Sequence, residues 1–106
     1  MSSSFSYKLT TESEQFTFDY SPVLGSSETI STSTCNVEVK EGTDSNPTAI
    51  LPGGANSGTI LGSKVAIRVS GGLDGVTYRL EMSVTTSLSN VYTIVGDLPV
   101  ISPINL

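Results

Sequence analysis

The chain has 106 residues, of which 37% are hydrophobic and 14% are charged, and ten acidic residues against five basic ones give a net charge of −5. This length has room for one domain. Because binding to nucleic acid or to an anionic membrane surface depends on basic groups, the acidic balance argues against both partners. A single cysteine, Cys35, excludes an intrachain disulfide, and the first residues do not have the pattern of a secretory signal, which fits synthesis in a reducing cytosol.

Apolar and polar residues alternate with a period of two along five segments, whereas no window keeps the spacing of an amphipathic helix. In chain order the alternating segments are QFTFDY (15–20), STCNVEVK (33–40), KVAIRVS (64–70), TYRLEMSVT (77–85) and VYTIV (91–95). Stretches rich in Gly, Pro, Ser, Asn and Asp separate them, as expected of turns. Short strands at this spacing predict an all-β fold, an antiparallel β-sandwich, with a small barrel as the alternative that periodicity does not separate from it.

The segment SGGLDGVTYRLEMSV (70–84) places a glycine-rich loop directly before a strand. Neither glycine pattern of a phosphate-binding loop fits it, and β-branched residues follow where a helix should begin. Immunoglobulin-like sandwiches carry a tyrosine at the corner before one strand, and its hydroxyl bonds to backbone upstream. The segment resembles this corner in fibronectin type III domains, with a hydrophobic plug, a turn and a buried tyrosine. The predicted corner residues are Leu73, Asp74, Gly75 and Tyr78.

The sequence offers few groups for catalysis or metal binding. It contains no histidine, which removes histidine-dependent nucleophilic catalysis and histidine metal sites. Cys35 shares a predicted inward face with Val37 and Val39, so we expect a buried and inert thiol. Asp44 and Asp74 lie in predicted turns but lack the Asp-x-Asp-x-Asp-Gly pattern of a calcium loop. We therefore predict no enzymatic activity, no catalytic residue, no cofactor and no metal ion.

Aromatic side chains on which sugars could stack point to a second class of function. The chain has no tryptophan, and most of its four tyrosines occupy alternating positions that are typical of core packing. Tyr7 and Tyr20 lie away from the central strands and stay open as surface candidates. A carbohydrate-binding or adhesive module is therefore the alternative to a purely structural role.

The two ends of the chain differ from its centre. We expect an N-terminal arm or first edge strand over residues 1–10, the sandwich over 11–97, and an extended proline-containing tail over 98–106, because proline prevents a helix there. Exposed apolar segments of this kind need cover. The tail either folds back along its own sandwich edge or lies on another subunit. The candidate assembly contacts are Phe5, Leu98, Val100, Ile101, Ile104 and Leu106.

The order of LGSSETISTSTCNVEV (24–39), KVAIRVSGGLDGVTYRLEMSVTTS (64–87) and a final strand resembles a family of small virion proteins of tailed bacteriophages. These are immunoglobulin-like domains described as fibre–tail adaptors or virion structural proteins. One departure is Cys35, where the family usually has an aromatic residue.

The resemblance implies a non-enzymatic structural subunit of a phage virion, made in the cytoplasm of the host bacterium. Such a subunit would belong to the tail, fibre adaptor or connector region, or decorate the capsid. It would dock on other virion proteins, as a homo-oligomer or in many copies within a larger assembly.

Overall fold

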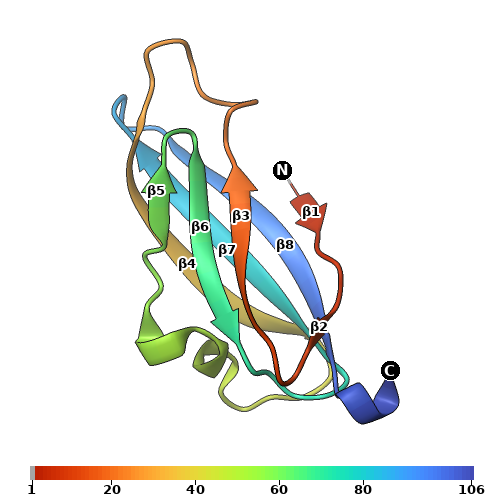
Figure 1. Ribbon diagram of the computed structural model, residues 1–106. Coiled ribbons are helices and arrows are strands. Elements are labelled where there is room, and N and C mark those ends of the chain that lie inside the picture. The colour runs from red at the N-terminus through yellow and green to blue at the C-terminus, as the bar shows by residue number, and fades with distance from the viewer. Residues whose placement is uncertain (1) are drawn as a thin grey trace.

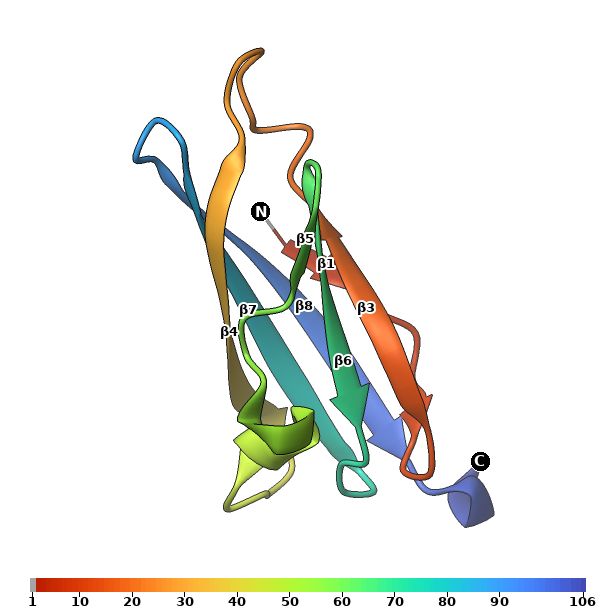
Figure 2. The same ribbon diagram turned by 60° about the vertical axis from the view of Figure 1, so that its left-hand side comes forward.

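The computed structural model describes residues 2–106, with side chains from Phe5 onward, so Met1 of the expected N-terminal arm lies outside the described residues (Figures 1 and 2). The strands are β1 (Ser2–Ser4), β2 (Lys8–Leu9), β3 (Ser13–Asp19), β4 (Ile30–Glu41), β5 (Thr59–Leu61), β6 (Lys64–Ser70), β7 (Val76–Thr86) and β8 (Val91–Ile101). The helical turns are η1 (Pro47–Ile50), η2 (Pro52–Gly54) and η3 (Pro103–Asn105), all of the 3-10 type. None of the helices in this part of the chain is long and apolar enough to cross a membrane.

The strands form two sheets, which confirms the predicted all-β fold. One sheet has the order β1-β8-β7-β4, with β2 also on β8, and the other has the order β3-β6-β5. β7 is antiparallel to both of its neighbours, and β6 is antiparallel to β3 and β5. β1 and β2 run parallel to β8. The two sheets face each other along the long axis of an elongated molecule of 48 × 24 × 19 Å (Figure 2).

The hydrophobic core lies between the two sheets and follows from the period of two in the strands. β7 shows the pattern most clearly, because Val76, Tyr78, Leu80, Met82 and Val84 are all at most 3% exposed. The facing sheet contributes the alternate residues of β3 and β6. These are Phe16, Phe18, Val65, Ile67 and Val69. Burial of this apolar surface is the main source of stability in a chain without a disulfide.

β8 extends beyond the alternating segment that predicted it, through Ile101. Leu98 is 0% exposed and Val100 is 1% exposed, so both lie in the core and the expected boundary at 97/98 falls inside a strand. Pro99, which has no N–H to donate, lies opposite the interruption between β1 and β2. The segment outside the sheet therefore begins at Ser102.

The N-terminal arm covers the free edge of β8 and inserts Phe5 between the sheets. The Phe5 ring lies 4.8 Å from the ring of Phe16 and 5.5 Å from that of Phe18, measured between centroids. Its N–H donates to the carbonyl of Asp97 at 3.1 Å. Gly96 leaves room for the ring, because a Cβ atom there would overlap it. Phe5 is thus an anchor within its own domain, and its expected role as a contact to another subunit stays a prediction.

A buried lysine ties the same arm to the loop between β6 and β7. Lys8 is 0% exposed, and its ammonium group donates to the carbonyls of Leu9, at 2.7 Å, and of Gly71. Burial lowers the pKa of Lys8, although the charges of Glu12 and Glu14 act in the opposite direction. The N-terminal arm, the edge of β8 and the β6–β7 loop are consequently held together.

We predict that Phe5→Ala lowers the free energy of unfolding by about 1–3 kcal/mol, because it removes the ring that joins the arm to the core. Tyr7→Ala is the matched control, since Tyr7 lies in the same arm and is 50% exposed. The measurement is the midpoint of urea unfolding. Equal midpoints for the two variants would contradict the anchoring role of Phe5.

Candidate functional site

The loop between β6 and β7 closes on Tyr78. The Tyr78 side chain is 0% exposed, and its hydroxyl accepts a hydrogen bond from the N–H of Leu73 at 2.9 Å. The same hydroxyl donates to Oδ2 of Asp44 at 2.6 Å. The tyrosine therefore connects β7 to the backbone before it and to the loop that follows β4.

These contacts change the acidity of both partners. Burial, followed by the hydrogen bond to Asp44, raises the pKa of Tyr78 to about 12. The hydrogen bonds from the Tyr78 hydroxyl and the Asn46 N–H hold the pKa of Asp44 below its usual value. The pair therefore keeps a neutral phenol and an ionised carboxylate over a wide pH range, which is the behaviour of a structural contact.

Leu73 differs from its expected role as a plug, because its side chain is 49% exposed. Its contribution to the corner is its backbone N–H. Gly72 and Gly75 have φ of 99° and 80°, which favour glycine. At Gly72 a Cβ atom would also lie 3.1 Å from Val100 and 3.3 Å from the Tyr78 ring. The glycines therefore serve the turn and its close packing.

The two aspartates considered for calcium bind protein groups. Asp44 accepts from Tyr78 and from the Asn46 N–H at 2.9 Å. Asp74 accepts from the Ser102 N–H at 2.7 Å and from the Asn105 side-chain amide at 2.7 Å. Within the part of the chain that the structure describes, no group of three or more His, Cys, Asp or Glu residues could hold a metal ion.

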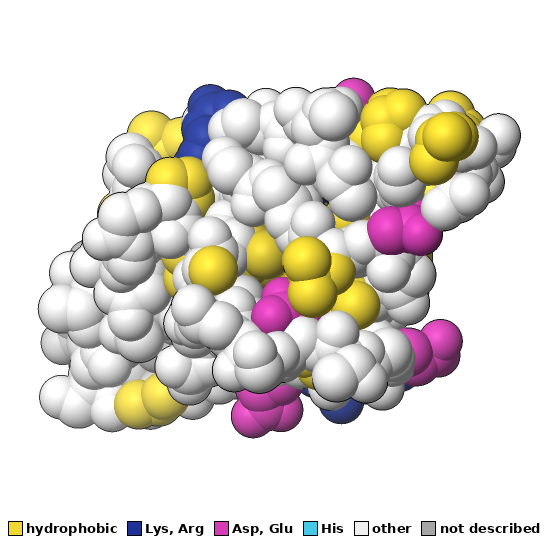
Figure 3. Space-filling model, turned by 90° about the horizontal axis from the view of Figure 1, so that it is seen from below, with side chains coloured by type: hydrophobic (Ala, Val, Ile, Leu, Met, Phe, Trp, Pro, Cys, Tyr) yellow, Lys and Arg dark blue, Asp and Glu magenta, His cyan; other side chains and the backbone are white. Residues whose placement is uncertain are grey.

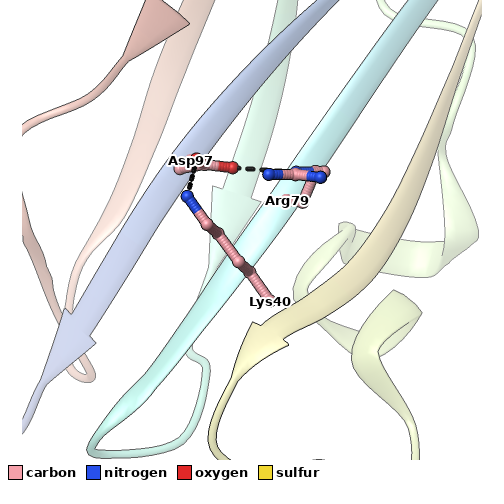
Figure 4. A network of polar contacts seen from close by, with 3 residues as sticks. All are labelled: Lys40, Arg79 and Asp97. Carbon is pink, nitrogen blue, oxygen red and sulfur yellow. Dashed lines mark hydrogen bonds and ion pairs between the residues drawn. The ribbon is translucent and has the colours of Figure 1, made fainter.

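An ionic cluster lies across three strands on the outer face of the larger sheet (Figure 4). Asp97 of β8 is 2.6 Å from Nζ of Lys40 on β4 and 3.1 Å from Nε of Arg79 on β7. Hydrogen bonds from Lys40 and Arg79 hold the pKa of Asp97 below its usual value. All three groups are partly exposed, so the cluster adds modestly to stability and mainly aligns the strands.

The two tyrosines considered for sugar binding differ in exposure. Tyr20 is 0% exposed and its hydroxyl donates to the carbonyl of Met82, so it belongs to the core. Burial raises the pKa of Tyr20 to about 12. Tyr7 is 50% exposed. The expected surface position of Tyr20 is therefore wrong, whereas Tyr7 lies at the surface as expected.

Cys35 lies in the core on the inward face of β4. Its side chain is 2% exposed, and burial raises the pKa of the thiol to about 11. A protonated, inaccessible thiol is a poor nucleophile, because the thiolate is the reactive form. The residue packs as a small apolar side chain.

The exposed candidate contacts are confined to the C-terminal turn. Ile104 is 87% exposed and Leu106 is 69% exposed, whereas Ile101 at the end of β8 is half-buried. Figure 3 views this end of the molecule and shows hydrophobic side chains gathered at the corner where η3 lies. Of the six candidate assembly contacts, these two are accessible on the isolated chain, while Phe5, Leu98 and Val100 serve their own domain.

The geometry describes a β-domain whose polar networks support its own loops. Residues 8–95 match the model of the family described as podophage GP4 fiber-tail adaptor protein gp77. The match covers most of the chain, and the chain belongs to this family of bacteriophage structural proteins. No match was found to a curated protein or to a solved structure.

We predict that Tyr78→Phe lowers the free energy of unfolding by about 1–3 kcal/mol, because the Leu73 N–H and the Asp44 carboxylate both lose a partner. Tyr7→Phe, which removes an exposed hydroxyl, is the control. Urea unfolding measures both. A Tyr78→Phe midpoint equal to that of the wild type would show that the corner hydrogen bonds add nothing.

The raised pKa values of Tyr20 and Tyr78 lead to a separate expectation. A group whose pKa is raised on folding stabilises the protein below its unfolded pKa near 10, and this contribution is lost as pH rises toward about 12. In a titration of tyrosinate absorbance, two of the four tyrosines of the folded protein should ionise near pH 12. Tyr78→Phe should remove one of these two late steps, and a profile unchanged by the substitution would rule out the assignment.

Proposed function

We propose that the chain is a non-enzymatic, immunoglobulin-like structural subunit of a phage virion that docks on neighbouring virion proteins in the fibre–tail region. Membership of the fibre–tail adaptor family over residues 8–95 is the observation that carries this proposal. The subunit is present in several copies and acts by contact alone. A place as a capsid decoration is less favoured, because the family description refers to fibre and tail.

The order of the strands supports the immunoglobulin-like assignment. In that fold, strands B, E and D form one sheet and C, F and G the other. Taking β3 to β8 as B to G in chain order, with β5 as D and β6 as E, the two observed sheets have these memberships. Tyr78, at the start of β7, then occupies the corner before strand F, and its hydroxyl bond to Leu73 is of the expected kind.

The distribution of exposed apolar groups supports docking by the ends of the domain. The N-terminal arm covers β8, so this long strand does not offer an open edge. Ile104 and Leu106 are the most exposed large hydrophobic side chains among the described residues. An apolar pair on a short turn is suited to inserting into a groove of a neighbouring protein.

The alternative function, a carbohydrate-binding or adhesive module, rests on Tyr7 alone, because Tyr20 is in the core. A single exposed tyrosine is a weak platform for sugar stacking. Binding on a glycan array that Tyr7→Ala abolishes would favour this alternative.

Deletion of residues 102–106 tests the docking role without cutting β8, which ends at Ile101. We expect the truncated protein to keep the free energy of unfolding of the wild type within about 1 kcal/mol, since exposed residues contribute little to stability. We also expect it to be missing from purified particles of the phage that encodes it. Leu88→Ala, at another exposed apolar position, should be incorporated normally.

Two outcomes would contradict different parts of the proposal. Normal amounts of the truncated protein in particles would overturn docking through the C-terminal turn. Wild-type particles that lack the chain altogether would overturn the virion function itself.

A further inference from the structure

The edge of β6 that faces β5 is paired over only part of its length. β5 pairs with residues 64–66, whereas β6 continues beyond this pairing toward η2 (Figure 1). The chain joins this edge only at Gly58, which has a φ of 70° and where a Cβ atom would lie 2.8 Å from the Ala66 carbonyl oxygen. Before Gly58 the chain lies against β4, since the Asn56 carbonyl accepts from the Cys35 N–H at 2.7 Å. Among the described residues, the rest of the β6 edge therefore has no strand beside it.

Arg68 lies in this uncovered part and directs its backbone N–H and C=O groups to the open side. In an antiparallel ladder both backbone groups of a residue point to the same neighbour, and the side alternates along the strand. The Tyr20 N–H donates to the Ser63 carbonyl at 2.9 Å, so Ser63 and every second residue after it bond to β3. Arg68 is out of phase with these residues, and its backbone groups therefore face the side that β5 has left.

A hollow of about 280 Å³ lies directly beside this edge. Arg68 forms one of its walls, and the chain between η2 and β5 forms the opposite wall. Its apolar lining comes from Pro52, Ala55 and Ile67, and its hydroxyl groups from Ser57 and Thr59. We refer to this hollow together with the open backbone of Arg68 as the edge groove. An extended peptide suits such a site, because its backbone pairs with the free N–H and C=O groups as an added strand.

The side chain of Arg68 adds a positive charge beside the edge groove. Among the described residues both ion pairs involve Asp97, and no carboxylate lies within ion-pair distance of the Arg68 guanidinium. Its hydrogen bond to the protein runs from Nη1 to the Ser13 carbonyl at 3.4 Å. A guanidinium group has five N–H donors, so most of them stay free for a carboxylate, which it binds through two parallel hydrogen bonds.

We propose that the edge groove binds an extended segment of a neighbouring virion protein, which adds a strand to β6 and places an Asp or Glu carboxylate on Arg68. The open backbone calls for an extended peptide, and the unpaired guanidinium calls for its negative charge. β6 of a second copy does not suit this role, because its sequence KVAIRVS carries two basic residues and no acidic one. The inference rests on the proposed function for the source of the segment.

The isolated chain tests the open edge itself. In hydrogen exchange followed by NMR, the Arg68 N–H should exchange at least about 100-fold faster than the N–H groups of Ile67 and Val69, which bond to β3. An Arg68 N–H as well protected as these two neighbours would show that the edge is already occupied, and would overturn the proposal.

Purified particles of the phage that encodes the chain test the occupant. In residue-resolved hydrogen exchange by mass spectrometry, the Arg68 N–H of the assembled chain should be protected, because the added strand accepts from it. A chain that is present in the particles with an unprotected Arg68 N–H would overturn this inference and leave the proposed function standing. Particles without the chain would overturn both.

A pair of matched variants tests the charge. Arg68→Gln removes the guanidinium, and we expect the amount of the variant in particles to fall by more than about tenfold at limiting concentration. Lys64→Gln is the control, since it makes the same change of charge on the same face of β6, opposite Asp19, and should be incorporated as the wild type is. Both positions are exposed, so both variants should keep the unfolding midpoint of the wild type. Equal incorporation of the two variants would show that no carboxylate binds Arg68 and would overturn the proposal.

Discussion

Pairing along both edges of β8 is the constraint on which the rest of the structure depends. β7 covers one edge, and the parallel strands β1 and β2 cover the other. The parallel pairing brings Phe5 over Gly96 and against the aromatic rings of β3, which links the two sheets. It also brings the ammonium group of Lys8 to the carbonyl of Gly71, at the start of the glycine loop. The corner and the C-terminal turn, which follow β6 and β8, take their positions from this arrangement.

The five longer strands could be predicted because each carries enough residues for a period of two to be visible. β5 could not, since it has three residues, and β1 and β2 were predictable only as an arm or edge strand over residues 1–10, because their pairing with β8 is decided by residues far away in the sequence. The end of β8 was expected to be a tail because of its prolines. Pro99 is compatible with a strand because it lies opposite a break in the pairing of the arm.

For the polar contacts of the corner, the sequence predicted one partner of each hydrogen bond but not the other. The position of Tyr78 follows from the local order of a glycine loop and an alternating strand, whereas Asp44 reaches its hydroxyl from 34 residues away. Asp74 was expected as a turn residue, but its bonds to Ser102 and Asn105 require the chain end to return to the same loop. Glu28 carried no local signal, because its donors come from the β7–β8 hairpin as well as from its own loop. Tyr20 was predicted as a surface candidate but is buried, because a tyrosine at the end of a strand can still point inward.

The interior and the covered edge of β8 serve the fold, and we propose that the C-terminal turn serves assembly. The most direct test is an electron-microscopy reconstruction of the intact virion in which the chain is built into density together with its neighbours. Docking through the C-terminal turn predicts that η3, with Ile104 and Leu106, contacts a neighbouring virion protein in this reconstruction. Neighbours that bind only along the edges of β3 or β4, with η3 in solvent, would contradict this docking.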